Sequence, residues 1–281
     1  VSVLAIATQA AEFVNVRDAD SLSQALENGK SAMLVKDISV DTSLLQYPLK
    51  VRSGKTVSLD LNGYRLYFRS RGNNKALFYV YKDATLTICD RKASSVSESV
   101  STVVNSAGNV ASCDGNVLTY YVTASKEDDA TNHTTVENTT RHVVTLGGGN
   151  AGAIVGINEK RYRTDRYAFL VEGTLNIEGG YICNFGDDSN TLSAICANTS
   201  TSTVILSGGV IAANKCDKGG AISLTGGAKM TMTGGIISGN TAINDGGGVY
   251  CSGASFNMSN GYITCNSQNE DIASEGGGGV Y

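Results

Sequence analysis

Apolar and polar residues alternate in four short runs in the second half of the chain, and each run leads into a glycine. The apolar members of these runs align without gaps: Leu175 and Ile177, Val204 and Leu206, Met230 and Met232, Phe256 and Met258. Strict alternation is typical of a β-strand with one buried face. The glycines that follow, at 180, 209, 235 and 261, are expected to supply a bend, because glycine adopts turn angles without steric penalty.

Two further series of positions repeat in step with these runs. One consists of Ala194-Ile195, Ala221-Ile222, Gly248-Val249 and Gly279-Val280, with spacings of 27, 27 and 31 residues. The other consists of Asn214, Asn240 and Asn266, each 26 residues from the last, whereas the first repeat has Phe185 there. Asparagine tolerates left-handed turn geometry and hydrogen-bonds to an asparagine above it, so we expect these side chains to stack.

A repeat of this length predicts a solenoid, because a single unit cannot bury its apolar face and a stack of units can. Coils about 4.8 Å apart would pair every strand with the coils above and below. We therefore expect an all-β protein with the fold of a right-handed parallel β-helix. A leucine-rich repeat has a similar period, but the Leu-x-x-Leu-x-Leu spacing is missing.

The first half carries similar strands without the strict period. Residues 20–29 form the pattern of a short amphipathic helix, with Asp20 or Ser21 as N-cap and Gly29 as its stop. We expect this helix to cap the open N-terminal end of the solenoid. Strands are expected at 32–35, 50–51, 57–61, 65–68, 76–81 and 85–89.

Residues 91–166 are rich in Ser, Thr, Asn and Asp and depart from the strand pattern. We interpret them as a polar insertion within one coil, with a hairpin that pairs 117–123 with 142–146 around a tip at 126–132. The apolar and then Ala-rich residues 1–11 look like the remainder of a signal peptide. The other expected segments are 12–90, the cap and first coils, and 167–281, repeat coils that continue beyond the chain end.

Composition agrees with strands and tight turns, with 33 Gly, 1 Pro and no Trp in 281 residues. The formal net charge of −4 gives no basic field for a phosphate backbone, so nucleic acid is not expected as a partner. No apolar stretch approaches the roughly 18 to 20 residues of a spanning helix, so no membrane insertion is expected within the chain. The seven cysteines form no CxxC pair, and we expect most of them to fill the core.

The pattern "GGxI…N…GGAI…TMTGGxI…N…GGGVY", over about residues 167 to 281, resembles the β-helix repeats of bacterial surface proteins in the pectate-lyase-like superfamily. The segment "SGKTVSLDLNGYRL" at 53–66 resembles a first coil of the same proteins and extends the likeness to about residue 90. The resemblance implies the fold and a secreted or cell-surface location. It does not imply one activity, because that superfamily includes lyases, hydrolases, adhesins and stalks.

Acidic residues fall near equivalent repeat positions after the asparagine series, at Asp187, Asp188, Asp217, Asp245, Glu270 and Asp271. Stacked coils would bring some of these carboxylates together, and Asp187, Asp188, Asp217 and Asp245 are the candidate ligands for calcium. A calcium-assisted polysaccharide lyase also needs a base, for which Lys215 or Lys218 beside Asp217 is the candidate, with Asp217 and Asp188 as further catalytic residues. Solvated acidic turns explain the same pattern without calcium or any other cofactor.

A glycoside hydrolase needs two carboxylates that flank the scissile bond. The resemblance would predict Asn-Thr-Asp, Asp-Asp, Gly-His-Gly and Arg-x-Lys motifs for it, and only adjacent Asp pairs such as Asp187-Asp188 are present. A separate candidate for ligand binding is a basic and aromatic stretch that suits an acidic sugar through arginine contacts and tyrosine stacking. Its residues are Arg161, Tyr162, Arg163, Arg166 and Tyr167.

Three functions remain open on the sequence. The first is a non-catalytic surface module, an adhesin or stalk, whose stiff rod presents the insertion and a lateral face to an extracellular glycan or a surface protein. The second is a secreted polysaccharide lyase or glycoside hydrolase that acts along a face of the β-helix. The third is a structural segment whose length matters and whose surface does not.

Overall fold

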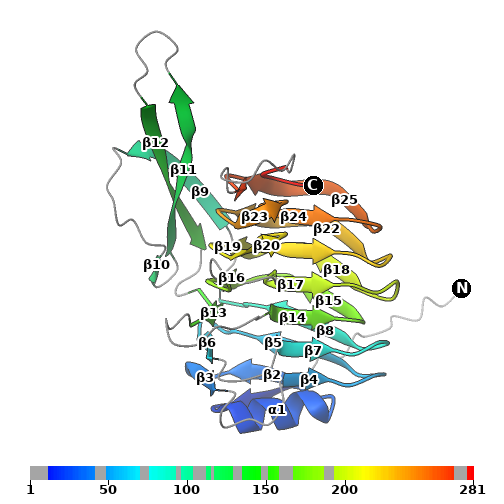
Figure 1. Cartoon of the computed structure of the whole chain (residues 1–281). Helices are drawn as coiled ribbons and strands as arrows, with labels where there is room; N and C mark the ends of the chain where they lie inside the picture. Colours follow the sequence, from blue (N-terminus) through cyan, green and yellow to red (C-terminus); the bar gives the residue numbers. More distant parts are fainter. Residues whose placement is uncertain are drawn as a thin grey trace, which may run out of the picture.

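The computed structural model of this chain describes residues 12–41, 49–69, 76–92, 96–103, 112–114, 117–128, 135–146, 151–157, 167–186, 193–268 and 277–281. Strands in these ranges wind into a parallel β-solenoid of about six turns, with a short helix near the N-terminus (Figure 1). The expected all-β solenoid with a helical cap is therefore confirmed. Residues 1–11, interpreted as the remainder of a signal peptide, lie outside the described residues.

Each complete coil contributes strands to three faces, called here faces 1, 2 and 3. Face 1 contains β1 (Phe13–Val16), β2 (Ser31–Leu34), β5 (Thr56–Asp60), β8 (Thr85–Cys89), β15 (Thr174–Ile177) and β18 (Thr203–Leu206). Face 2 contains β3 (Ile38–Asp41), β6 (Arg65–Arg69), β13 (Ala153–Gly156), β16 (Tyr181–Cys183) and β19 (Val210–Ala212). Two longer strands run through the bend between faces 1 and 2 and join them into one sheet, namely β22 (Lys229–Ser238) and β25 (Ser255–Thr264).

Face 3 is a separate parallel sheet. It contains β4 (Leu49–Val51), β7 (Ala76–Val80), β14 (Tyr167–Val171), β17 (Ile195–Ala197), β21 (Ile222–Leu224) and β24 (Val249–Cys251). A small three-stranded sheet follows face 2 in the last coils, made of β20 (Lys215–Lys218), β23 (Thr241–Asp245) and β26 (Ser267–Gln268).

The repeats stack in the register that the sequence predicts. On face 1 successive rungs are occupied by Leu175, Val204, Met230 and Phe256. On face 3 they are occupied by Ile195, Ile222, Val249 and Val280. The bends stack as well, because a Cβ placed on Gly209, whose φ is 75°, would lie 2.7 Å from the carbonyl oxygen of Gly180 in the coil before it.

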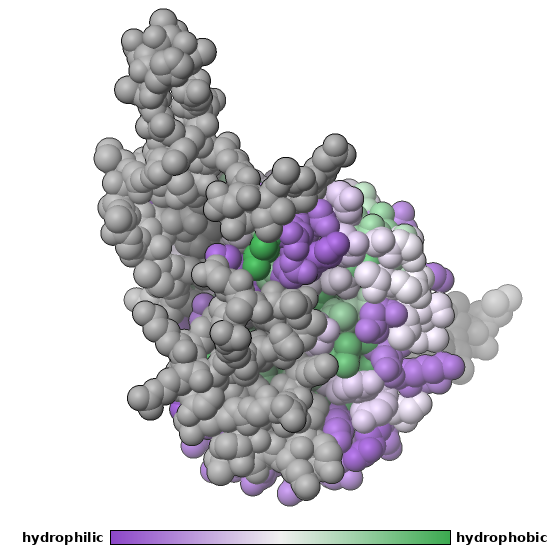
Figure 2. Space-filling model, in the orientation of Figure 1, coloured by the Kyte–Doolittle hydropathy of each residue, from purple (hydrophilic) through white to green (hydrophobic). Residues whose placement is uncertain are grey.

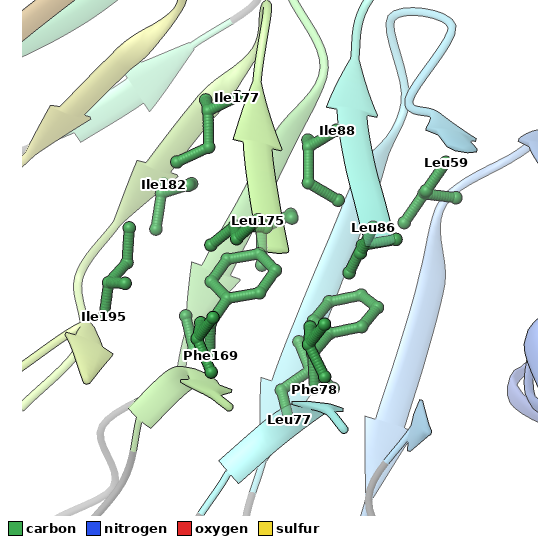
Figure 3. Packing of buried hydrophobic residues seen from close by; sticks show 14 of the residues in the cluster. Leu59, Leu77, Phe78, Leu86, Ile88, Phe169, Leu175, Ile177, Ile182 and Ile195 are labelled. Carbon is green, nitrogen blue, oxygen red and sulfur yellow. The ribbon is translucent and has the colours of Figure 1, made fainter. Parts of the chain in front are cut away.

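Files of apolar side chains fill the interior, one side chain from each coil. The rings of Phe78 and Phe169 lie 4.9 Å apart and nearly parallel, although the insertion separates them in the sequence. Figure 3 shows these two rings with Leu86 and Leu175 beside them, all four fully buried. The core therefore runs without interruption past the point where the insertion leaves the solenoid.

The predicted asparagine stack is confirmed. The side-chain amide nitrogen of Asn214 donates to Oδ1 of Asn240, and that of Asn240 donates to Oδ1 of Asn266, both at 2.9 Å. The backbone N–H of Phe185, which takes the place of asparagine in the first repeat, donates to Oδ1 of Asn214. The residue with left-handed backbone angles is the one before the asparagine, such as Ala213 with φ 54°, and not the asparagine itself as expected. The asparagines therefore serve as hydrogen-bonding groups.

The capping helix α1 (Ala19–Glu27) packs Leu22, Ala25 and Leu26 against the first coil. The prediction that Asp20 or Ser21 is the N-cap is wrong. Asp18 takes that position because its side chain accepts from the backbone N–H of Ser21 at 2.8 Å, completing a reciprocal capping box. This hydrogen bond lowers the pKa of Asp18.

All six strands predicted in the first half are present, as β2, β4, β5, β6, β7 and β8, with bounds that differ by at most one residue. The structure adds β1 and β3, which the sequence did not predict. Strand β3 is short and polar at alternate positions, because Ser39 separates its two buried apolar residues and Asp41 follows the second, so the strand does not stand out in the sequence.

The insertion forms an antiparallel sheet beside the coils (Figure 1), in the order β10 (Ser112–Asp114), β11 (Val117–Asp128), β12 (Thr135–Leu146) and β9 (Val96–Val103). The predicted hairpin is confirmed, since Tyr120 lies opposite His142. Its strands run beyond the expected start of the tip, because Asp128 still pairs with Thr135. The solenoid also resumes before residue 166, because β13 pairs with both β6 and β16.

Candidate functional site

The site residues predicted from the sequence fall on the connections that lead from face 2 to face 3, or at their end. Lys215, Asp217 and Lys218 belong to β20, and Asp245 ends β23, so the structure brings these four to one small sheet. Tyr167 begins β14, and the remaining predicted site residues lie outside the described residues: Arg161, Tyr162, Arg163, Arg166, Asp187, Asp188, Glu270 and Asp271.

Lys218 and Asp245 occupy paired positions on β20 and β23 and form an ion pair, with Nζ 3.0 Å from Oδ2. The lysine is 44% exposed and the aspartate 13% exposed. The same ammonium lies 5.2 Å from the ring centroid of Tyr250, whose ring stacks on Tyr281. The hydrogen bond to Asp245 raises the pKa of Lys218, so this side chain stays protonated at neutral pH and is a poor general base.

Asp217 has a different partner. The side-chain amide of Asn244 donates a hydrogen bond to Oδ1 of Asp217. Asp217 lies where the pairing of β20 with β23 shifts register, between Cys216 opposite Ala242 and Lys218 opposite Asp245. The sequence had not singled out Asn244, although its distance from Asp217 is one repeat length. Asp217 and Asp245 are thus each engaged by a neighbouring side chain.

Lys215 begins β20 and is partly exposed. Its backbone N–H donates to the carbonyl oxygen of Phe185 at 2.9 Å, which ties β20 to the coil before it. Among the described residues, no group of three or more histidine, cysteine, aspartate or glutamate side chains is arranged to hold a metal ion. Of the expected calcium ligands, Asp187 and Asp188 lie outside that part of the chain.

Tyr167 is the described member of the basic and aromatic stretch. It begins β14, is partly exposed, and hydrogen-bonds the thiol of Cys196 on the neighbouring strand β17. Burial raises the pKa of Cys196, and it raises the pKa of the Cys216 thiol to about 12. These two cysteines are free and buried, so they behave as small core residues rather than as nucleophiles.

The two ends of the insertion are held together by a buried carboxylate that the sequence did not reveal. Asp90, 5% exposed, precedes the insertion and accepts hydrogen bonds from the backbone N–H of Gly63 at 2.8 Å and of Gly152 at 2.6 Å. Gly152 is where the chain returns to the solenoid. Asp60 supports this arrangement from the coil before, because its Oδ1 accepts from the backbone N–H of Arg91 and its Oδ2 lies 3.4 Å from Nε of Arg91.

Figure 2 shows one face of the molecule, on which the coloured surface is mostly hydrophilic or neutral with a few small apolar patches. In the part of the chain that the structure describes, no helix has the length and apolar character to cross a membrane. Fold and topology define the chain as a parallel β-solenoid protein with a β-sheet insertion. No protein-family model, curated protein or solved structure matches it.

Proposed function

We propose that the chain is a non-catalytic secreted or cell-surface module, an adhesin or stalk, that presents a binding surface to an extracellular glycan or a surface protein. The observation that carries the proposal is that two of the candidate catalytic residues are already paired with neighbouring side chains. Lys218 is held by Asp245, and Asp217 is held by Asn244. Proton abstraction needs a basic group close to its substrate, and the raised pKa of Lys218 opposes that role.

The insertion supports a display function. Its chain ends meet at Asp90, inside a bend of a continuous core, so the β-sheet of the insertion is mounted on a stiff support. Rigid scaffolds that position surface segments are common in recognition proteins. The proposal therefore has two surfaces to offer a ligand, the insertion and the outside of the coils.

The test is a glycan array and a surface-protein binding screen combined with a polysaccharide-cleavage screen, all on the full chain. We expect saturable binding without release of unsaturated or reducing ends. Addition of calcium and of a chelator to the same assays tests a role for the predicted acidic ligands. If the wild type releases products and a Lys218→Met variant with an unchanged circular dichroism spectrum does not, the chain is a lyase and the proposal is wrong.

A further inference from the structure

Two tyrosines in contact lie on the outer side of face 3. Tyr79 belongs to β7 and Tyr81 follows directly after it, and both are partly exposed. Their ring centroids lie 4.4 Å apart with the planes tilted by 46°. Two tyrosine rings in contact offer a broad amphipathic surface that is apolar on the ring faces and polar at the hydroxyls.

The position of Tyr79 is fixed by a residue from the next coil. Its hydroxyl donates to Oε1 of Glu172 at 2.6 Å, and Glu172 follows directly after β14, the strand that pairs with β7. Burial, and then this hydrogen bond, raises the pKa of Tyr79, so its phenol remains neutral throughout the physiological range. The ring is therefore held in place before any ligand arrives, which reduces the entropy lost on binding.

The same place in the following coil is occupied by Asn198. This exposed residue follows directly after β17, which pairs with β14 as β14 pairs with β7. Tyr81, Glu172 and Asn198 thus come from three successive coils at one edge of face 3, with a strand spacing of about 4.8 Å. A ring, a carboxylate and an amide follow one another along the solenoid axis.

Two of the charged side chains around these residues, Arg52 and Glu172, already have partners within the protein. Arg52, which follows the face 3 strand of the preceding coil, donates from Nη2 to Oε2 of Glu27 at 3.0 Å. Glu172 accepts from the hydroxyl of Tyr79. A charged ligand would have to compete with these partners, whereas a neutral ligand with many hydroxyls and apolar C–H surfaces would not.

We propose that Tyr79, Tyr81, Glu172 and Asn198 form a binding site for a neutral glycan chain that lies along the solenoid axis. The tyrosine rings stack against the C–H faces of the sugars, while the carboxylate and the amide bond sugar hydroxyls. This inference rests on the proposed binding function and specifies the ligand class and the surface. It assigns glycan contact to face 3 and leaves the insertion free for a second partner.

The experiment is a calorimetric titration of the full chain with cellohexaose, laminarihexaose and mannohexaose, and with hexagalacturonate as the charged comparison. We expect at least one neutral hexasaccharide to bind. The double variant Tyr79→Ala/Tyr81→Ala should lose about tenfold or more in affinity, since each aromatic contact is worth several-fold. The matched control is Tyr262→Ala on β25, because this tyrosine is 68% exposed and lies on the strand that spans faces 1 and 2.

Glu172→Gln keeps the shape of the side chain and removes its charge, so a neutral ligand should lose only about threefold or less, the effect of one weakened hydrogen bond. Thermal unfolding of every variant confirms that the fold is intact. The inference is overturned if the double variant binds as tightly as the wild type, or if hexagalacturonate alone binds. In either case binding persists and the proposed function stands. Cleavage, or no binding of any glycan or protein, overturns the proposed function itself.

Discussion

The bend between faces 1 and 2 is built in two different ways in the two halves of the molecule. In the repeat coils it is a glycine turn, in which bends stack backbone against backbone, as Gly209 does on Gly180. In the first coils the buried carboxylates of Asp60 and Asp90 accept the backbone N–H groups of the bend. The same backbone requirement is thus met by close packing in one half and by side-chain acceptors in the other.

The two halves also differ after face 2. The repeat coils carry the asparagine ladder, whereas the coil before them has Phe185 at this turn, and its ring stacks on that of Phe68 in β6 with the centroids 6.4 Å apart. Phe185 is the junction, because its backbone N–H still donates to Asn214. At the coil without the ladder, the contact of Phe185 with Phe68 is joined by a hydrogen bond from the side-chain amide of Asn184 to the carbonyl oxygen of Gly156 at 2.7 Å.

The largest effect should come from the ladder. Asn240→Ala removes a fully buried side chain that accepts from Asn214 and donates to the carbonyl oxygen of Ile211 and to Asn266. We expect a loss of about 3 kcal/mol or more in the free energy of unfolding, because several buried groups lose their partners. Urea denaturation measures it, with the exposed Asn257→Ala as control. Equal stability of the two variants would mean that the ladder does not hold the coils together.

The glycine bends come next. Gly209→Ala places a Cβ 2.7 Å from the Gly180 carbonyl oxygen at a φ of 75°, and we expect a loss of about 2 to 3 kcal/mol from clash and strain together. Gly253→Ala is the matched control, because Gly253 has a φ of 59° but nothing within 4 Å of the added atom. The difference between their urea midpoints isolates the clash, and identical midpoints would remove close packing as the reason for glycine at 209.

The carboxylate bend should be less sensitive. Asp90→Asn keeps one acceptor but turns an amide toward a backbone N–H, and we expect a loss of about 1 to 2 kcal/mol. Amide hydrogen exchange should accelerate at Gly63 and Gly152, the two donors to Asp90, and not in the repeat coils. Asp83→Asn, at an exposed turn, serves as control. Unchanged exchange at both glycines would contradict the role of Asp90 at the base of the insertion.

The smallest effect is expected for the exposed ion pair. Lys218→Met should cost less than about 1 kcal/mol, as is usual for a solvent-exposed pair. Because the folded pKa of Lys218 is raised, its contribution is complete below the ordinary lysine pKa and is lost as the pH rises through the raised value. Wild type and variant should therefore differ equally from pH 6 to 9 and converge as the pH rises further into alkali; Lys82→Met, exposed at a turn, is the control. A difference that changes between pH 6 and 9 would contradict this assignment.

The repeat coils could be predicted from the sequence in detail, because each rung recurs at a nearly constant spacing. Leu175, Val204 and Met230 are similar in kind and lie in equivalent positions, so their pairing follows from the period alone. In the first coils the sequence predicts the strands but not which strands pair with one another. Phe78 contacts Phe169 across the whole insertion, and no local pattern reveals a contact over that distance.

The site was less predictable because it depends on which side chain faces which. Clustered acids suggested shared calcium, but Asp217 and Asp245 each have a neutralising or hydrogen-bonding partner on the adjacent strand. Tyr79 and Glu172 come together from coils on opposite sides of the insertion, so their spacing in the sequence carries no signal. In the sequence Asp90 resembles an ordinary turn residue, and only the structure shows that the backbone N–H groups of Gly63 and Gly152 both donate to its carboxylate.

The way the insertion leaves and returns gives the rod a modular character. Both of its ends lie at Asp90, and β8 and β13 belong to neighbouring faces of the same coil, as in a coil with no insertion. An excursion of different length or sequence at this point would leave the pairing of the coils unaltered. The solenoid can therefore accommodate a different insertion at this bend while the pairing of its coils stays the same.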